Sequence, residues 1–128
     1  MQVTVPVSVG ELLDKITILE IKIERIVERE KHLNVARELS ELLARRDALG
    51  LDRPDLRPLV AELAQVNRRL WEVEDDLRRL ETARDFGPVF VRLARSVYRE
   101  NDRRAEIKRE LNRLTGSHLV EEKSYSAG

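Results

Sequence analysis

The sequence of 128 residues predicts an all-α protein, an antiparallel bundle of three to four long helices with coiled-coil-like seams. Aromatic residues make up only 4% of the chain and charged residues 38%, so the core must be built from Leu, Ile, Val and Ala along narrow helical stripes. Apolar residues also recur at alternating steps of three and four through three long segments, which is typical of helices that pack lengthwise. A chain of this length suits one domain, and we expect a single helical domain over residues 1–128.

Residues 1–8 are predicted to form a short extended arm. The stretch "VTVPVSV" alternates apolar with small or polar side chains, but Pro6 lacks the backbone donor that a central strand requires. A helix is predicted to begin after Ser8, because its hydroxyl can accept a hydrogen bond from a free amide while Glu11 reaches back to the cap. Lys15 lies near the positive end of this helix and is a candidate anion-binding residue.

Helical spacing continues over residues 9–49. The apolar phase shifts by two residues after "REKHLN", so this segment is either one helix or a kinked helix pair. We expect the kink or short break near His32 to Asn34. Gly50 ends the segment, and "GLDRPDLRP" is typical of a loop because of its Gly, Asp and Pro content.

The strictest pattern covers residues 56–82, which are predicted to form one long helix. Its seam positions are all apolar: Leu56, Leu59, Leu63, Val66, Leu70, Val73, Leu77 and Leu80. After the interruption "RDFGP", residues 86–115 are predicted to form a helix or a helix pair in a single heptad phase. Gly116 suits the left-handed end of that helix, and residues 117–128 are expected to form a flexible tail. Three apolar residues of the tail are candidates for folding back onto the bundle: Leu119, Val120 and Tyr125.

The segment "RENDRRAEIKREL", residues 99–111, interrupts the last seam, because Glu100 and Arg104 occupy two core positions. Two interpretations are structural: Asn101 or Asp102 caps a second helix, or Glu100 and Arg104 pair across one helical turn. Under these interpretations Arg104→Leu is expected to complete the seam and stabilise the fold. A third is functional, a polar pocket whose donors bind a carboxylate or phosphate group. Its candidate residues, besides Lys15, are Tyr98, Asn101, Arg103, Arg104 and Lys108.

The last helical segment is also locally basic. Residues 84–113 contain nine basic and five acidic residues, and Arg92, Arg95 and Arg99 share one helical face. Such a face can contact an anion or nucleic acid. We interpret it first as pairing with the acidic stretch "EVEDD", residues 72–76, of a neighbouring helix.

Four stretches of the chain resemble a family of small helical bacterial proteins that carry a domain of unknown function. They are "SVGELLDKITILEIKIERI", "LWEVEDDLR", "ARSVYRENDRRAEIKREL" and "GSHLVEEKSY", which span most of the sequence. The resemblance implies no activity, ligand or catalytic residue. The stretch "LLDKITILEIKIER" is also loosely similar to the opening helix of chorismate mutases, small all-helical enzymes that act on an anionic metabolite. That class uses a late Gln or Glu beside its ligand, whereas the Gln residues here are Gln2 and Gln65.

Composition excludes several classes of function. The 24 basic and 24 acidic residues cancel, which argues against general attraction to nucleic acid or an anionic membrane surface. Without cysteine there is no disulfide or thiolate site, and His32 and His118 lack metal-ligand spacing, so we expect no metal and no cofactor. No apolar run approaches the roughly 20 residues that span a bilayer. We therefore expect a cytoplasmic protein.

The expected function is that of a noncatalytic helical interaction or scaffold protein. The apolar seams offer more surface than a three-helix bundle of this size covers, so we expect a homodimer or another homo-oligomer, with another protein as a further possible partner. The alternative is a small all-helical enzyme or binding protein for an anionic metabolite. Nucleic-acid binding has less support because there are few aromatic residues for stacking.

Overall fold

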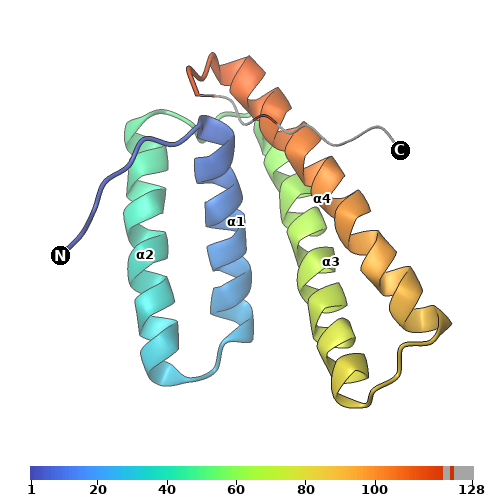
Figure 1. The fold of residues 1–128 in the computed structure, drawn as a ribbon. Helices are drawn as coiled ribbons and strands as arrows, with labels where there is room; N and C mark the ends of the chain where they lie inside the picture. The colour runs from blue at the N-terminus through green and yellow to red at the C-terminus, as the bar shows by residue number, and fades with distance from the viewer. Residues whose placement is uncertain (120–121, 123–128) are drawn as a thin grey trace.

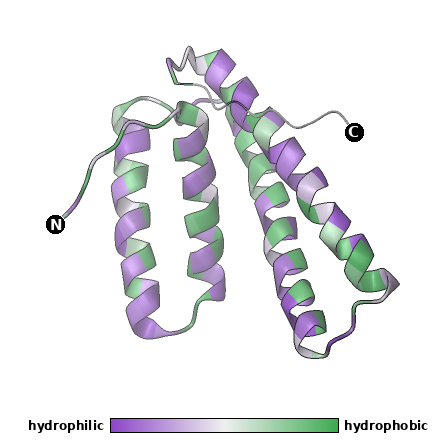
Figure 2. Cartoon of the chain, viewed as in Figure 1, coloured by the Kyte–Doolittle hydropathy of each residue, from purple (hydrophilic) through white to green (hydrophobic). Residues whose placement is uncertain are grey.

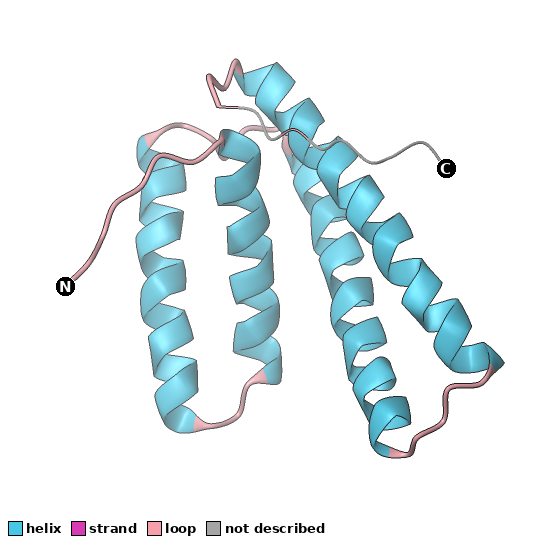
Figure 3. Cartoon of the chain, in the orientation of Figure 1, coloured by secondary structure: helices cyan, strands magenta, loops and turns pink. Residues whose placement is uncertain are grey.

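The computed structural model describes residues 1–119 and residue 122. Within these residues all regular structure is helical: α1 (Val9–Arg25), α2 (Arg29–Ala48), α3 (Arg57–Thr82) and α4 (Pro88–Thr115), as Figures 1 and 3 show. The predicted helical bundle is confirmed. The suggested folding back of Val120 and Tyr125 falls on residues outside the described part of the chain.

The four helices form two antiparallel hairpins. Helix α2 packs along α1, and α1 in turn contacts both α3 and α4, which pack against each other (Figure 1). Helix α1 is therefore the element that joins the two hairpins. This central place explains its broad apolar surface, because it must be covered from more than one side.

The break in the first helical segment lies at residues 26–28, so the predicted position near His32 to Asn34 is wrong. Ile26 and Glu28 adopt extended backbone angles, which allows the chain to reverse and α2 to run back along α1. The apolar phase shifts later than the reversal because the first half-buried apolar residue of α2 is Val35. Nothing in the apolar pattern therefore marks the start of α2.

Helices α3 and α4, which form the second hairpin, are each continuous. Helix α3 covers almost the whole segment predicted from the strict seam, and α4 is a single helix rather than a pair. Pro88 occupies the first turn of α4, where its missing N–H is harmless. Gly116 ends α4 with a φ of 63°, the left-handed conformation that glycine adopts without a steric penalty.

The core lies toward one end of the molecule. The buried residues of α3 belong to its first half, and those of α4 belong to its second half, where α1 packs against both. The fully buried apolar side chains include Leu13, Leu19, Ile21, Leu56, Leu63, Val66, Ile107 and Leu111. Hydrophobic residues continue beyond this core into the first turns of α4 (Figure 2). The other end of the α3–α4 hairpin is thus only partly covered.

Candidate functional site

Helix α1 approaches α4 very closely at Gly10. A Cβ atom at this position would lie 2.6 Å from the backbone oxygen of Lys108, closer than side chains tolerate. The Gly10 N–H donates to Asn112 Oδ1 at 2.7 Å. The Ser8 hydroxyl accepts from the Glu11 N–H at 3.1 Å, as predicted, but the Glu11 carboxylate bonds Lys108 of α4 instead of reaching back to the cap. The first turn of α1 is therefore held both by its own cap and by α4.

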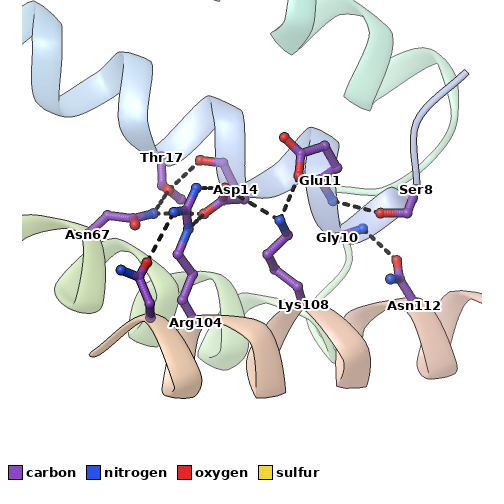
Figure 4. A network of polar contacts seen from close by, with 10 residues as sticks. Ser8, Gly10, Glu11, Asp14, Thr17, Asn67, Arg104, Lys108 and Asn112 are labelled. Carbon is purple, nitrogen blue, oxygen red and sulfur yellow. Dashed lines mark hydrogen bonds and ion pairs between the residues drawn. The ribbon is translucent and has the colours of Figure 1, made fainter. Parts of the chain in front are cut away.

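Asp14, one turn further along α1, is the centre of a buried polar network (Figure 4). Its side chain is 1% exposed, and its carboxylate accepts hydrogen bonds from Arg104 Nε at 2.9 Å and from Arg104 Nη2. Asn67 Nδ2 of α3 donates to the same carboxylate at 2.9 Å and to Thr17 Oγ1 at 2.8 Å. Thr17 in turn donates to the backbone oxygen of Asp14 at 2.7 Å. The Asp14 carboxylate of α1 thus connects three helices, because it binds the Arg104 guanidinium group of α4 and the Asn67 amide of α3.

Lys108 brings a second cation to the same carboxylate. Its Nζ lies 2.6 Å from Glu11 Oε2 and 3.9 Å from Asp14 Oδ2, and its side chain is 9% exposed. Every buried side-chain nitrogen and oxygen in the described part of the chain has a hydrogen-bond partner. Two carboxylates of α1 therefore face two cations of α4, and these pairs clamp the helices together.

The segment of residues 99–111 lies within the single helix α4, so the predicted cap is wrong, whereas the continuous helix of the second interpretation is confirmed with other partners for its two charges. Asn101 and Asp102 are interior helical residues and cap no helix. Glu100 accepts a hydrogen bond from Arg69 Nε of α3 at 2.9 Å, whereas Arg104 bonds Asp14. Both charges find partners on other helices because three helices meet at this level. The interruption of the seam therefore serves contacts between helices.

Three of the six candidate anion-binding residues lie together. Arg104 and Lys108 of α4 face the network around Asp14 (Figure 4). Asn101, one turn before Arg104 on the same helix, accepts a hydrogen bond at its Oδ1 from Arg104 Nη1 at 3.5 Å. The cations of this group already contact carboxylates of α1.

The other three candidates lie elsewhere on the surface. Lys15 is exposed and lies 3.1 Å from Glu38 of α2, and the Tyr98 side chain is exposed on α4. Arg103 bonds Glu62 and then Glu106, and these hydrogen bonds raise the pKa of its guanidinium group. These three residues do not contribute to the buried network.

Sequence reasoning missed the residues that complete the network. Asp14 is its centre, but from the sequence alone it is most simply a surface residue, and Asn67 and Asn112 have no distinguishing motif. One signal was present: polar residues at helical spacing form a stripe on α4. The stripe consists of Asn101, Arg104, Lys108 and Asn112. It indicates a polar face but not the residue that this face meets.

A groove of about 490 Å³ opens beside the network, between α1, α3 and the middle of α4. Its apolar walls are Ile18, Ile21, Leu70 and Trp71. Asn67, Asn101 and Arg104 line the part of the groove next to the network. Further along α3 the lining becomes charged. The charged lining residues are Glu74, Asp75 and Arg78. We call this surface the α1–α3 groove.

The basic face of α4 does not pair with residues 72–76, so that interpretation is wrong for the described residues. Among these residues, no carboxylate forms an ion pair with Arg92, Arg95 or Arg99. At 3.6 residues per turn these arginines lie on the side of α4 opposite its seam with α3, which explains why they do not reach residues 72–76. They line a shallow depression of about 540 Å³ together with Phe86, Gly87, Pro88 and Val91. We call this surface the α4 basic stripe.

In the described part of the chain, no group of three or more His, Cys, Asp or Glu side chains is placed to hold a metal ion. None of the helices there is long and apolar enough to cross a membrane.

Comparison with known proteins gives one match. The model of a protein family described only as of unknown function covers residues 1–128. Neither the curated proteins nor the solved structures contain a match to the chain.

Proposed function

Since the chain belongs over residues 1–128 to the family of unknown function DUF6165, we propose a role from its own residues: a noncatalytic helical interaction protein that associates with copies of itself. The observation that supports the proposal is the uneven cover of the α3–α4 seam. Apolar residues line the seam on both sides of the interruption at Glu100 and Arg104, but the buried ones are confined to the part that α1 covers.

The end of α1 defines where this cover stops. Arg25, the last residue of α1, bonds Glu72 of α3 at 3.2 Å, and α3 continues to Thr82. This extension is about 15 Å long at 1.5 Å per residue. Its seam residues and those of the facing part of α4 are only half-buried: Val73, Leu77, Leu80, Phe90, Leu93 and Val97. Two helices bury a seam of this kind only when a further helix packs over it, and another copy of the chain can supply that helix.

Exposed apolar side chains at the start of α4 support the same proposal. Phe86 is 52% exposed, Val89 47% and Val91 43%, and the Phe86 ring packs edge-on against that of Phe90. Large apolar side chains grouped in this way mark contact surfaces more often than scattered ones do.

The alternative function, binding of an anionic metabolite, has weaker support. It needs cations that are available to a ligand, and the two candidate cations that lie together bond carboxylates of the same chain. A ligand would have to displace Asp14 or Glu11 from these contacts, which would leave a buried charge without its partner.

The test of the proposal is the mass of the full chain in solution. Light scattering after size-exclusion chromatography should give a multiple of the 14.9 kDa chain mass, and analytical ultracentrifugation should show that this multiple is lost on dilution. A mass of one chain at every concentration up to about 100 μM, far above typical dissociation constants of specific complexes, would overturn it.

A further inference from the structure

We propose that the α4 basic stripe of one copy lies in the α1–α3 groove of the next copy. This inference rests on the proposed self-association and specifies the two surfaces that meet. It begins from charged side chains on the two surfaces that form no ion pair within a single copy.

The basic stripe is unlike most of the charged surface of this protein. Elsewhere the arginines commonly contact carboxylates of the same chain, as Arg68 does with Glu24 and Arg103 with Glu62. Residues 86–99 contain no Asp or Glu, so the stripe has no acidic neighbour on its own helix. In the described part of the chain it has no ion-pair partner on another helix either.

The groove offers carboxylates as partners for these arginines, beside Arg78 and the Asp14-bound Arg104 in its lining. Glu74 and Asp75 line it, and within the described residues neither side chain forms an ion pair. Glu72 and Asp76 lie on the same part of α3 but already contact Arg25 and Arg79 of the same chain. The chain as a whole is neutral, so carboxylates and arginines that do not meet within one copy can neutralise each other between copies.

The apolar parts of the two surfaces are also complementary. The stripe has Phe86, Pro88 and Val91 beside its arginines, and the groove has Trp71 and Leu70 beside its carboxylates. An amphipathic helix that enters a groove between two helices buries its apolar residues against the walls and keeps its charges at the rim. The first three turns of α4 have this composition.

The positions of the two surfaces define the kind of assembly. The groove lies on the side of α3 that faces α1, whereas the stripe lies on the side of α4 opposite its seam with α3. A contact between two different surfaces is head-to-tail, and surfaces on opposite sides of a hairpin produce a ring or chain of copies. The expected assembly is therefore larger than a dimer.

Charge reversal on the full-length chain tests this pairing. The groove variant carries Glu74→Arg and Asp75→Arg, and the stripe variant carries Arg92→Glu and Arg95→Glu. Each variant alone places like charges at the contact, so its dissociation constant should rise at least about tenfold. An equimolar mixture should assemble again, because the basic groove of one variant meets the acidic stripe of the other and the remaining surfaces are unchanged. A single chain with all four substitutions should also assemble.

Matched controls on α2 keep the change of net charge the same. Glu30→Arg with Glu41→Arg corresponds to the groove variant, and Arg37→Glu with Arg45→Glu corresponds to the stripe variant; all four side chains are exposed. These controls should assemble like the natural sequence. Circular dichroism should show unchanged helix content for every variant.

The possible outcomes separate this inference from the proposed function. If the natural chain is a single copy at all concentrations, self-association itself fails. If it assembles but both reversed variants assemble equally well, or if the natural assembly is a strict dimer, self-association stands and the pairing of groove and stripe is overturned. A natural chain that binds a labelled single-stranded oligonucleotide and dissociates from its own copies would assign the stripe to nucleic acid, and would also overturn the pairing.

Discussion

Arg104 donates two hydrogen bonds to Asp14, a residue 90 positions away in the sequence, and this pair joins α4 to α1. The carboxylate is almost completely buried, while 28% of the arginine side chain remains exposed. Removal of the arginine would leave a buried carboxylate with an incomplete set of partners. The pair therefore decides how the two hairpins are placed relative to each other.

Arg104→Leu should destabilise the fold, contrary to what the seam pattern predicts. The expected loss in the free energy of unfolding is about 3 kcal/mol, because a buried charge loses its main partner. Urea denaturation measures it. Adding Asp14→Leu to Arg104→Leu should recover part of the loss, since both charges are then gone. Arg103→Leu, which removes an exposed pair, should cost no more than about 1 kcal/mol. A single Arg104→Leu variant as stable as the natural chain would contradict the role of this pair.

Gly10→Ala should destabilise the contact between α1 and α4. The new methyl group would lie 2.6 Å from the Lys108 carbonyl oxygen, so the backbones must separate, at a cost of about 2 kcal/mol. Thermal unfolding followed by circular dichroism measures the change. Gly87→Ala is the control, because its nearest neighbour is the Asp85 side chain at 3.2 Å, which can move. Equal stability of the two variants would mean that the close approach at Gly10 has little energetic importance.

Ser8→Ala should shorten or weaken the start of α1. The Glu11 N–H would lose its acceptor, and the expected cost is about 1 kcal/mol. Thr4→Ala, in the exposed arm, should leave stability unchanged. Hydrogen exchange of the Glu11 amide gives a local measurement, and unchanged protection of that amide would show that the cap is dispensable.

The contact between Glu24 and Arg68 should make stability depend on pH. Hydrogen bonds from Arg68 are the main cause of the lowered pKa of Glu24, relative to its ordinary value of 4.5. A carboxyl with a lowered pKa in the folded state stabilises the fold above its unfolded pKa, and this contribution is lost as the pH falls through the folded pKa. The stability difference between the natural chain and Glu24→Gln should therefore be largest near neutral pH and shrink below about pH 4.5. Urea denaturation at pH 7 and pH 3 tests this, and a difference that grows in acid would contradict it.

Trp71→Ala should weaken self-association more than it weakens the fold. Trp71 lines the groove and is only half-buried in one chain, so its burial would be completed by another copy. Large aromatic side chains commonly dominate such contacts, and the dissociation constant should rise at least about tenfold. Sedimentation velocity over a dilution series measures it. Leu33→Ala, which removes an exposed apolar residue of α2, should leave assembly unchanged. Equal effects of both substitutions would show that Trp71 is not part of the interface.

The helices could be predicted from the sequence because helical periodicity is a local property. The seam of residues 56–82 nearly coincides with α3, and the cap at Ser8 and the end at Gly116 depend on residues within one turn. The reversal at residues 26–28 escaped prediction, because α2 contains no buried residue and its first half-buried apolar residue is Val35.

The partners of charged residues depend on the tertiary structure. The sequence alone determined that Glu100 and Arg104 interrupt a seam, and that Arg92, Arg95 and Arg99 share a face. Only the packing of α1 against α4 decided that Arg104 meets Asp14. The packing of α3 along the α4 seam likewise decided which arginines face outward. Periodicity defines the face of a helix on which a residue lies, but the partner of that face depends on where the other helices lie, often many residues away in the chain.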